Sequence, residues 1–136
     1  MRVAFGTDLA NPVTAAVVAA LEASGHEVVQ DLTSTWPEVG RRVGEAMAGG
    51  SADAGVVCCW TGTGVSIAAN KVPGVRAALC VDAETARGAR RWNDANVLAL
   101  SLRLSSEAVA VEVAEAFFAT VDVDPDERPN IDRVEG

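Results

Sequence analysis

The feature that most constrains this chain is a regular alternation of short apolar runs with longer segments of helical periodicity. Apolar runs of strand length occur at residues 2–6, 27–30, 54–59, 76–81 and 96–101. Segments of helical spacing or capping pattern follow them at residues 13–24, 35–48, 62–70, 82–91 and 105–120. Repeated strand–helix alternation predicts a parallel sheet with helices on both faces. The expected fold class is therefore α/β, a three-layer αβα, doubly wound, Rossmann-like arrangement around a five-stranded parallel sheet.

The length of the chain fits one domain with a tail. A chain of 136 residues is large enough to bury one hydrophobic core. We expect residues 1–120 to form the α/β domain, and the acidic, proline-bearing residues 121–136 to form a tail that packs on the domain or on a dimer partner. The apolar runs are too short to span a bilayer, and the first residues lead straight into a strand without a signal-peptide pattern. A cytoplasmic location and no membrane partner are expected.

Charge and cysteine usage exclude several classes of function. The net charge is −8 and Lys71 is the single lysine, so we expect no nucleic-acid partner. One histidine and three cysteines do not supply a zinc site, and we expect neither a metal nor a cofactor. Cys58 and Cys59 are neighbours on an expected strand and so point to opposite faces. Cys58 and Cys80 lie inside apolar runs and are expected in the core, as reduced thiols.

The most informative stretch is Cys59–Ser66, with the sequence CWTGTGVS. It leaves a buried strand, turns on two glycines and enters a helix, at the edge of the sheet where doubly wound proteins bind ligands. Backbone N–H groups and the helix dipole there favour a phosphate, a carboxylate or an enediolate, and they favour the thiolate form of Cys59. The stretch is neither a dinucleotide-binding fingerprint nor a P-loop.

Each of these residues also has a purely structural interpretation. The Cys59 stretch is equally consistent with a tight turn beside an inert, buried cysteine. Asp8 follows the first strand, where it caps or turns the chain or else orients a substrate hydroxyl. Asn93 is an ordinary turn residue that could equally hydrogen-bond a polyol. Arg103, just past the fifth strand, is placed to meet an anion.

Taken together, these segments resemble the ribose-5-phosphate isomerase B and galactose-6-phosphate isomerase family over residues 1–119. Family members open with a strand followed by Gly-Ser-Asp-His-Ala-Gly, where this chain has Gly6–Asn11. The family motif Cys-Gly-Thr-Gly-x-Gly-x-Ser is represented by Cys59–Ser66. The segments Ser66–Lys71 and Asn93–Leu100 are similar to family blocks as well. Several blocks in the same order make the resemblance specific.

The resemblance implies an aldose–ketose isomerase that works without metal as a homodimer, or as a tetramer built from dimers. A base moves a proton between C1 and C2 of a small sugar or sugar phosphate through an enediolate. The family uses a cysteine at the position of Cys59 or a glutamate at the position of Val65, and valine takes no proton, so Cys59 is the expected base. Thr61 and the loop amides are expected to stabilise the enediolate. The expected substrate-binding residues are Asp8, Gly62, Thr63, Gly64, Ser66, Asn93, Arg103, Arg128 and Arg133.

The chain also departs from the family pattern. The two family histidines, one for the phosphate and one for opening the sugar ring, are replaced by Leu9 and Trp92, and Trp60 replaces a loop glycine. The tail keeps Arg128 and Arg133, but not the family spacing that reaches the partner's phosphate site. We expect Leu9, Trp60 and Trp92 to make one crevice narrower and drier than in the relatives.

Two functions fit these departures. The first is an isomerase for a short or open-chain sugar phosphate rather than ribose 5-phosphate. The second is a catalytically impaired protein of the isomerase fold that binds a small sugar or an anionic metabolite without turnover. Retention of Cys59, Thr61 and Asp8 favours the first, and loss of the two histidines favours the second.

Overall fold

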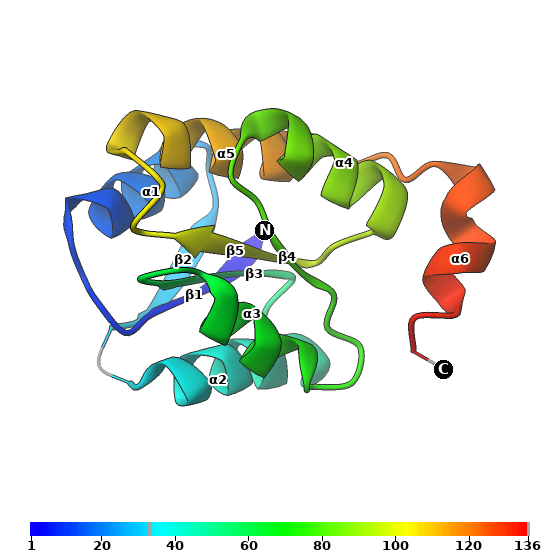
Figure 1. The fold of residues 1–136 in the computed structure, drawn as a ribbon, viewed down its shortest axis with the longest axis horizontal. Coiled ribbons are helices and arrows are strands. Elements are labelled where there is room, and N and C mark those ends of the chain that lie inside the picture. Colours follow the sequence, from blue (N-terminus) through cyan, green and yellow to red (C-terminus); the bar gives the residue numbers. More distant parts are fainter. Residues whose placement is uncertain (33, 136) are drawn as a thin grey trace.

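The computed structural model describes residues 1–32 and 34–135, which fold into one open sheet covered by helices (Figure 1). The strands are β1 (Arg2–Thr7), β2 (Glu27–Asp31), β3 (Ala54–Cys59), β4 (Ala77–Leu79) and β5 (Val97–Ser101). The helices are α1 (Pro12–Ala23), α2 (Trp36–Ala48), α3 (Thr63–Asn70), α4 (Ala83–Asn93), α5 (Glu107–Ala119), the 3₁₀ turn η1 (Pro125–Glu127) and α6 (Arg128–Asp132). Within these residues, no helix has both the length and the apolar character needed to cross a membrane.

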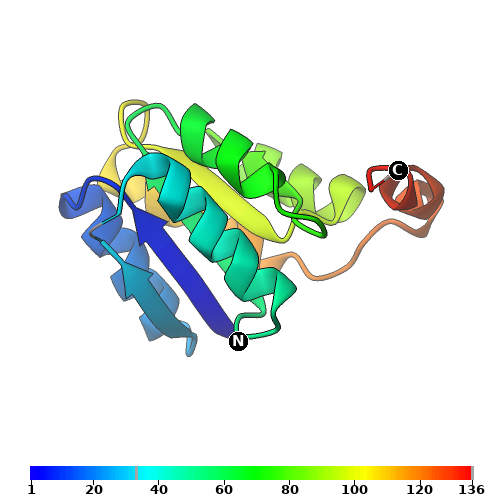
Figure 2. The same ribbon diagram turned by 90° about the horizontal axis from the view of Figure 1, so that it is seen from below.

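The sheet has five strands in the order β2-β1-β3-β5-β4, and all of its pairings are parallel. Helices α1, α4 and α5 cover one face, and α2 and α3 cover the other (Figures 1 and 2). The predicted three-layer, doubly wound α/β fold is therefore confirmed.

The strand order creates a switch point between β1 and β3. The chain leaves β1 through α1 toward β2, whereas it leaves β3 through α3 toward β4 on the opposite side and the opposite face. The two loops therefore diverge at the carboxyl ends of these strands, and ligands of such sheets bind at this position.

Each face of the sheet has its own hydrophobic core. Val56 and Cys58 point into the core beneath α1, α4 and α5, while Val57 and Cys59 point into the core beneath α2 and α3. Cys58 and Cys80 are fully buried, as predicted. Burial raises the pKa of Cys80 to about 11, with a contribution from Asp82, and it raises the pKa of Cys58 even further.

Helices α2 and α3 lie side by side in close contact (Figure 2). Gly40 permits this approach, because a Cβ added there would lie 2.8 Å from both the backbone nitrogen of Ala69 and the carbonyl oxygen of Val65. The contact holds the first turn of α3, and with it the loop after β3, against the rest of the domain.

The structure differs from the prediction in two places. The fourth strand is three residues long rather than the predicted 76–81, and it lies at the edge of the sheet. The tail, for which no helix was predicted, contains η1 and α6, and each of them has a proline among its first two residues. It touches the domain through a 2.7 Å bond from the Asp124 amide to the Arg91 carbonyl and a 3.1 Å bond from the Gly74 amide to the Glu135 carboxylate.

Candidate active site

The carboxyl ends of β1, β3 and β5 lie next to one another and bring three loops together. Thr7 pairs with Cys58, and Cys59 pairs with Ser101. Ser101 therefore lies beside Cys59 on one side, and Asp8, the residue after Thr7, follows in register on the other side, since adjacent strands lie about 4.8 Å apart. The sequence prediction placed these residues at one edge, and the strand register does so.

Cys59 is the last residue of β3 and is 5% exposed, on the face that carries α3. Asp8 is exposed on the neighbouring loop. Burial is the main cause of the raised pKa of Cys58, and Cys59 and the Asp8 carboxylate add to it. Val65, at the position of the family's alternative base, is fully buried in the core.

Gly62 turns the chain from β3 into α3. Its φ is +76°, and an added Cβ would lie 2.9 Å from the backbone carbon of Leu100, so only glycine fits at this position. The helix begins at Thr63, and the N–H groups of its first turn lack partners inside the helix. The hydroxyls of Thr61 and Thr63 are 2.7 Å apart and exposed. Groups of this kind can bind an anion, and here they lie next to Cys59.

The loop after β5 is attached to the loop after β3 through the backbone. The carbonyl of Cys59 accepts a 3.1 Å bond from the Leu102 amide, and the carbonyl of Trp60 accepts a 2.8 Å bond from the Arg103 amide. The Ser101 hydroxyl donates a further bond of 3.2 Å to the Trp60 carbonyl. Arg103 is exposed at the same edge. The structure thus places the cation of Arg103 on a segment whose position is fixed relative to Cys59.

Two further residues shape the site and were missed in the sequence. The fully buried Thr7 donates a 2.9 Å bond to the Leu9 carbonyl and accepts a 3.2 Å bond from the Leu9 amide, which fixes the turn that carries Asp8. Trp36 lies against Gly64, because a Cβ added to Gly64 would be 2.8 Å from the Trp36 ring. The position of Trp36 after the second strand could have placed it at this edge of the sheet from the sequence.

The remaining predicted residues lie at the opposite edge. Asn93 ends α4 and precedes β5, and the distance along β5 from Val97 to Ser101 is roughly 13 Å at strand geometry. Arg128 and Arg133 lie in the tail, and Arg128 pairs with Asp94 at 3.5 Å. One chain therefore does not bring Asn93, Arg128 or Arg133 to Cys59.

A single chain does not bring the three apolar groups of the predicted crevice together. Leu9 and Trp60 are about half exposed at the edge that holds Cys59. Trp92 lies one turn before the amino end of β5, and its ring packs back on Gly88, where an added Cβ would be 2.8 Å away. Helical side chains point toward the start of their helix, which explains this direction.

The described residues include no group of three or more histidine, cysteine, aspartate or glutamate side chains placed to hold a metal ion. The polar groups at the carboxyl edge are a thiol, a carboxylate, a guanidinium, two threonine hydroxyls and backbone amides. This set can move a proton and stabilise a negative charge that develops on an oxygen atom.

The chain is similar to known sugar-phosphate enzymes along most of its length. A family model described as Ribose/Galactose Isomerase matches residues 3–134. Ribose-5-phosphate isomerase B of Escherichia coli is 36% identical over 122 residues, which are 85% of this chain and 82% of that protein. D-erythrulose-4-phosphate isomerase of Pectobacterium atrosepticum is 39% identical over 82 residues, 60% of this chain. The alignment covers 82% of the Escherichia coli protein and 54% of the Pectobacterium atrosepticum protein. It covers 59% of galactose-6-phosphate isomerase subunit LacB of Clostridium acetobutylicum.

The fold is similar as well. The structure of ribose-5-phosphate isomerase B from Clostridium thermocellum superposes with a TM-score of 0.92 at 31% identity, covering 99% of this chain and 95% of that one. The likeness covers both edges of the sheet and the tail.

Proposed function

This chain belongs to the ribose/galactose isomerase family, and from that premise we propose that it is an aldose–ketose isomerase of a small sugar phosphate. The observation that supports this most is the juxtaposition of Cys59, Asp8 and the first turn of α3 at the switch point of the sheet. A base, a hydroxyl ligand and an oxyanion site in one crevice are what enediolate chemistry needs.

Cys59 is the proton carrier in this proposal. Its thiolate removes the proton from C2 of the aldose and returns it to C1, and the hydroxyl proton moves from O2 to O1. The negative charge that develops on oxygen is stabilised by the Thr61 hydroxyl and the amides of the first turn of α3. Asp8 accepts a hydrogen bond from a substrate hydroxyl. Gly62, Thr63, Gly64 and Ser66 supply the backbone that encloses the reacting carbons.

A second copy of the chain completes the site. Asn93, Arg128 and Arg133 lie at the edge opposite Cys59, so they reach a substrate at Cys59 only from a partner chain. In a symmetric dimer, the amino edge of each copy faces the carboxyl edge of the other, and two equivalent sites form. Asn93 then binds a sugar hydroxyl, and Arg128 and Arg133 bind the phosphate together with Arg103. Trp92 enters the crevice beside Leu9 and Trp60 by the same route.

The substrate is a short sugar phosphate. Leu9 and Trp92 stand where the resemblance calls for histidine, so the group that opens a cyclic sugar is missing. A tetrose 4-phosphate cannot close a furanose through its phosphorylated oxygen and needs no such group. One relative is named for D-erythrulose 4-phosphate. Free, buried cysteines fit an enzyme of the reducing cytoplasm.

The test compares kcat/KM for erythrulose 4-phosphate, erythrose 4-phosphate and ribose 5-phosphate. We expect the tetrose phosphates to be at least about tenfold better, since lost acid–base assistance costs about 10²–10⁴-fold on a cyclic substrate. Efficient turnover of ribose 5-phosphate contradicts the substrate assignment. Tight binding of 4-phosphoerythronate without turnover of any of the three substrates supports the second function, a binding protein that has lost catalysis. The absence of both histidines favours this second function.

A further inference from the structure

Asp94 occupies an unusual backbone position between α4 and β5. Its φ is +47°, and among the described residues it is the one non-glycine residue with a positive φ. Aspartate tolerates the left-handed region better than most residues, yet the position still costs free energy. A backbone of this kind persists where the surrounding contacts hold it in place. The contacts of its side chain supply that restraint.

Three arginines converge on the Asp94 carboxylate. Arg90 of α4 lies 3.1 Å from it, Arg76 before β4 lies 3.4 Å away, and Arg128 of α6 lies 3.5 Å away. The Asp94 side chain is 23% exposed. Its backbone carbonyl accepts another bond, of 2.8 Å, from Nε of Arg76. One residue therefore connects three segments that are distant in the sequence.

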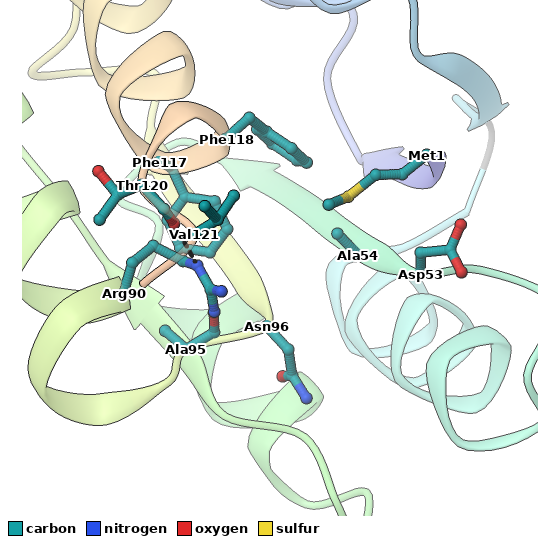
Figure 3. Close-up of a pocket in the computed structure, with 10 residues that line it drawn as sticks. All are labelled: Met1, Asp53, Ala54, Arg90, Ala95, Asn96, Phe117, Phe118, Thr120 and Val121. Atoms are coloured by element: carbon teal, nitrogen blue, oxygen red, sulfur yellow. Dashed lines mark hydrogen bonds between the residues drawn. The ribbon is translucent and has the colours of Figure 1, made fainter. Parts of the chain in front are cut away.

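Arg90 anchors this cluster to the domain. Its Nε donates a 3.1 Å bond to the Thr120 carbonyl, Nη1 donates to the Ala95 carbonyl, and the guanidinium lies 5.7 Å from the centre of the Phe117 ring. Figure 3 shows these four residues together on the wall of a small pocket at the amino edge of the sheet. Arg90 is 19% exposed, so the Asp94 carboxylate rests on a restrained partner.

Arg128 differs from the other two arginines in its exposure. The side chains of Arg76 and Arg90 are 21% and 19% exposed, whereas that of Arg128 is 46% exposed. Asp94 and Asp132 both approach the same nitrogen of Arg128, Nη1. In the described part of the chain, the Nε and Nη2 donors contact no carboxylate and are left for another anion. These two donors form an edge of the guanidinium that can bind a phosphate bidentately.

We propose that Asp94 is a positioning residue for substrate binding. Asn93 directly precedes Asp94 in the chain, and the Asp94 carboxylate holds the Arg128 guanidinium at a fixed distance from it. One rigid unit therefore presents a group that binds the phosphate and a group that binds a sugar hydroxyl. The inference rests on the proposed function, which assigns those two roles to Arg128 and Asn93. Asp94 itself touches no substrate.

The first test is the Asp94→Asn variant, which keeps the size of the side chain and its tolerance of a positive φ. KM for erythrulose 4-phosphate is expected to rise about tenfold, while kcat changes less than about twofold, because the charge-assisted contact to Arg128 is lost and Cys59 lies at the other edge. Glu45→Gln is the matched control, since Glu45 pairs with Arg41 at 3.0 Å on the surface of α2. It should change neither constant. An unchanged KM in Asp94→Asn overturns the inference.

The second test is a double-mutant cycle with Arg128→Gln. If Asp94 acts through Arg128, Asp94→Asn should raise KM by less than about twofold in the Arg128→Gln background. If the KM increase of the double variant equals the product of the two single increases, Asp94 acts independently of Arg128, and the inference is overturned. If Asp94→Asn does not fold, Asp94→Gly replaces it in the cycle, because glycine adopts a positive φ without backbone strain.

A binding measurement separates this inference from the proposed function. The dissociation constant for inorganic phosphate is measured by calorimetry in the wild type and in Asp94→Asn. If the wild type turns over none of the sugar phosphates, the proposed function fails, and phosphate affinity alone decides the role of Asp94. Weaker binding in the variant supports the role, and equal binding overturns it.

Discussion

The two edges of the sheet are built from different polar groups. At the carboxyl edge, the loop after β3 is held by backbone bonds to the loop after β5 and by the turn at Gly62. At the amino edge, ion pairs among arginines and Asp94 hold the chain. Main-chain bonds persist through most substitutions, whereas ion pairs change with a single residue. We therefore expect the chemical step to depend on the first edge and substrate affinity to depend on the second.

The largest effect is expected at the carboxyl edge, from Cys59→Ala. Removing the base should lower kcat for erythrulose 4-phosphate by about 10³-fold, since acid–base catalysis contributes about 10²–10⁴-fold. Cys58→Ala and Cys80→Ala should leave kcat within about threefold, because both thiols are in the core. Steady-state kinetics and iodoacetamide labelling measure this. Full activity in Cys59→Ala, or preferential labelling of Cys80, contradicts the role of Cys59.

Gly62→Ala should have the next largest effect. The added Cβ would lie 2.6 Å from the Leu79 side chain and 2.9 Å from the Leu100 backbone, so the loop has to move and kcat should fall by about 10²-fold. Gly50→Ala is the matched control, because Gly50 has the same φ of +76° with nothing within 4 Å. Both variants should lose about 1–2 kcal/mol of unfolding free energy from the backbone alone. Equal kcat in the two variants would show that the loop geometry is not needed.

Mixing inactive variants tests whether the two edges meet between chains. Asn93→Ala should lower kcat/KM by about tenfold or more, and Cys59→Ala should abolish turnover. The Cys59→Ala chain is mixed with a second variant in which Asn93, Arg128 and Arg133 are all replaced. In the heterodimer, one site combines the intact Cys59 of the second variant with the intact Asn93, Arg128 and Arg133 of the first. The other site lacks both sets of residues. The equilibrated mixture should therefore regain about a quarter of wild-type activity.

The control for this experiment is each variant alone at the same total concentration. Activity that does not exceed the sum of the two controls indicates that the site lies within one chain. Light scattering that shows a monomer at the assay concentration leads to the same conclusion.

The smallest effect concerns the core between the edges. Burial raises the pKa of Cys80 from about 9 to about 11, so between these pH values the unfolded thiol ionises while the folded one stays protonated. The contribution of Cys80 to stability is full below pH 9 and falls as the pH rises toward 11, by roughly 1 kcal/mol at pH 10. Cys58, whose pKa is raised further, adds a loss of similar size at pH 10. Urea unfolding at pH 8 and pH 10 measures the change, and Cys80→Ala should reduce it. A wild-type stability independent of pH over this range is the contrary result.

The sequence predicts the layers of this fold better than it predicts which site residues lie at which edge of the sheet. Apolar runs and helical spacing locate all five strands within a few residues, because buried parallel strands are apolar on both faces. They do not reveal that β5 lies between β3 and β4, since strand order depends on long-range pairing. At the start of β4, Arg76 bonds Asp94 and Asn96 instead of extending the strand.

For the site, the position of a residue relative to its strand decides the outcome. Cys59 ends one strand and Asp8 follows another, so their placement at the carboxyl edge was predictable. Asn93 and Trp92 precede β5, and residues before a strand lie at the amino edge, which the prediction of one crevice overlooked. The roles of Thr7 and Asp94 depend on hydrogen bonds and ion pairs that local sequence does not encode.

The order of the strands also affects how the chain can fold as it is made. In the described part of the chain, β4 forms strand pairs with β5 alone, and β5 comes later in the sequence. A nascent chain that ends before Val97 can pair β2, β1 and β3, but it leaves the apolar edge of β3 open. Open apolar edges of this kind promote association between chains. Protection against aggregation during synthesis therefore depends on how quickly β5 inserts between β3 and β4 once it has been made.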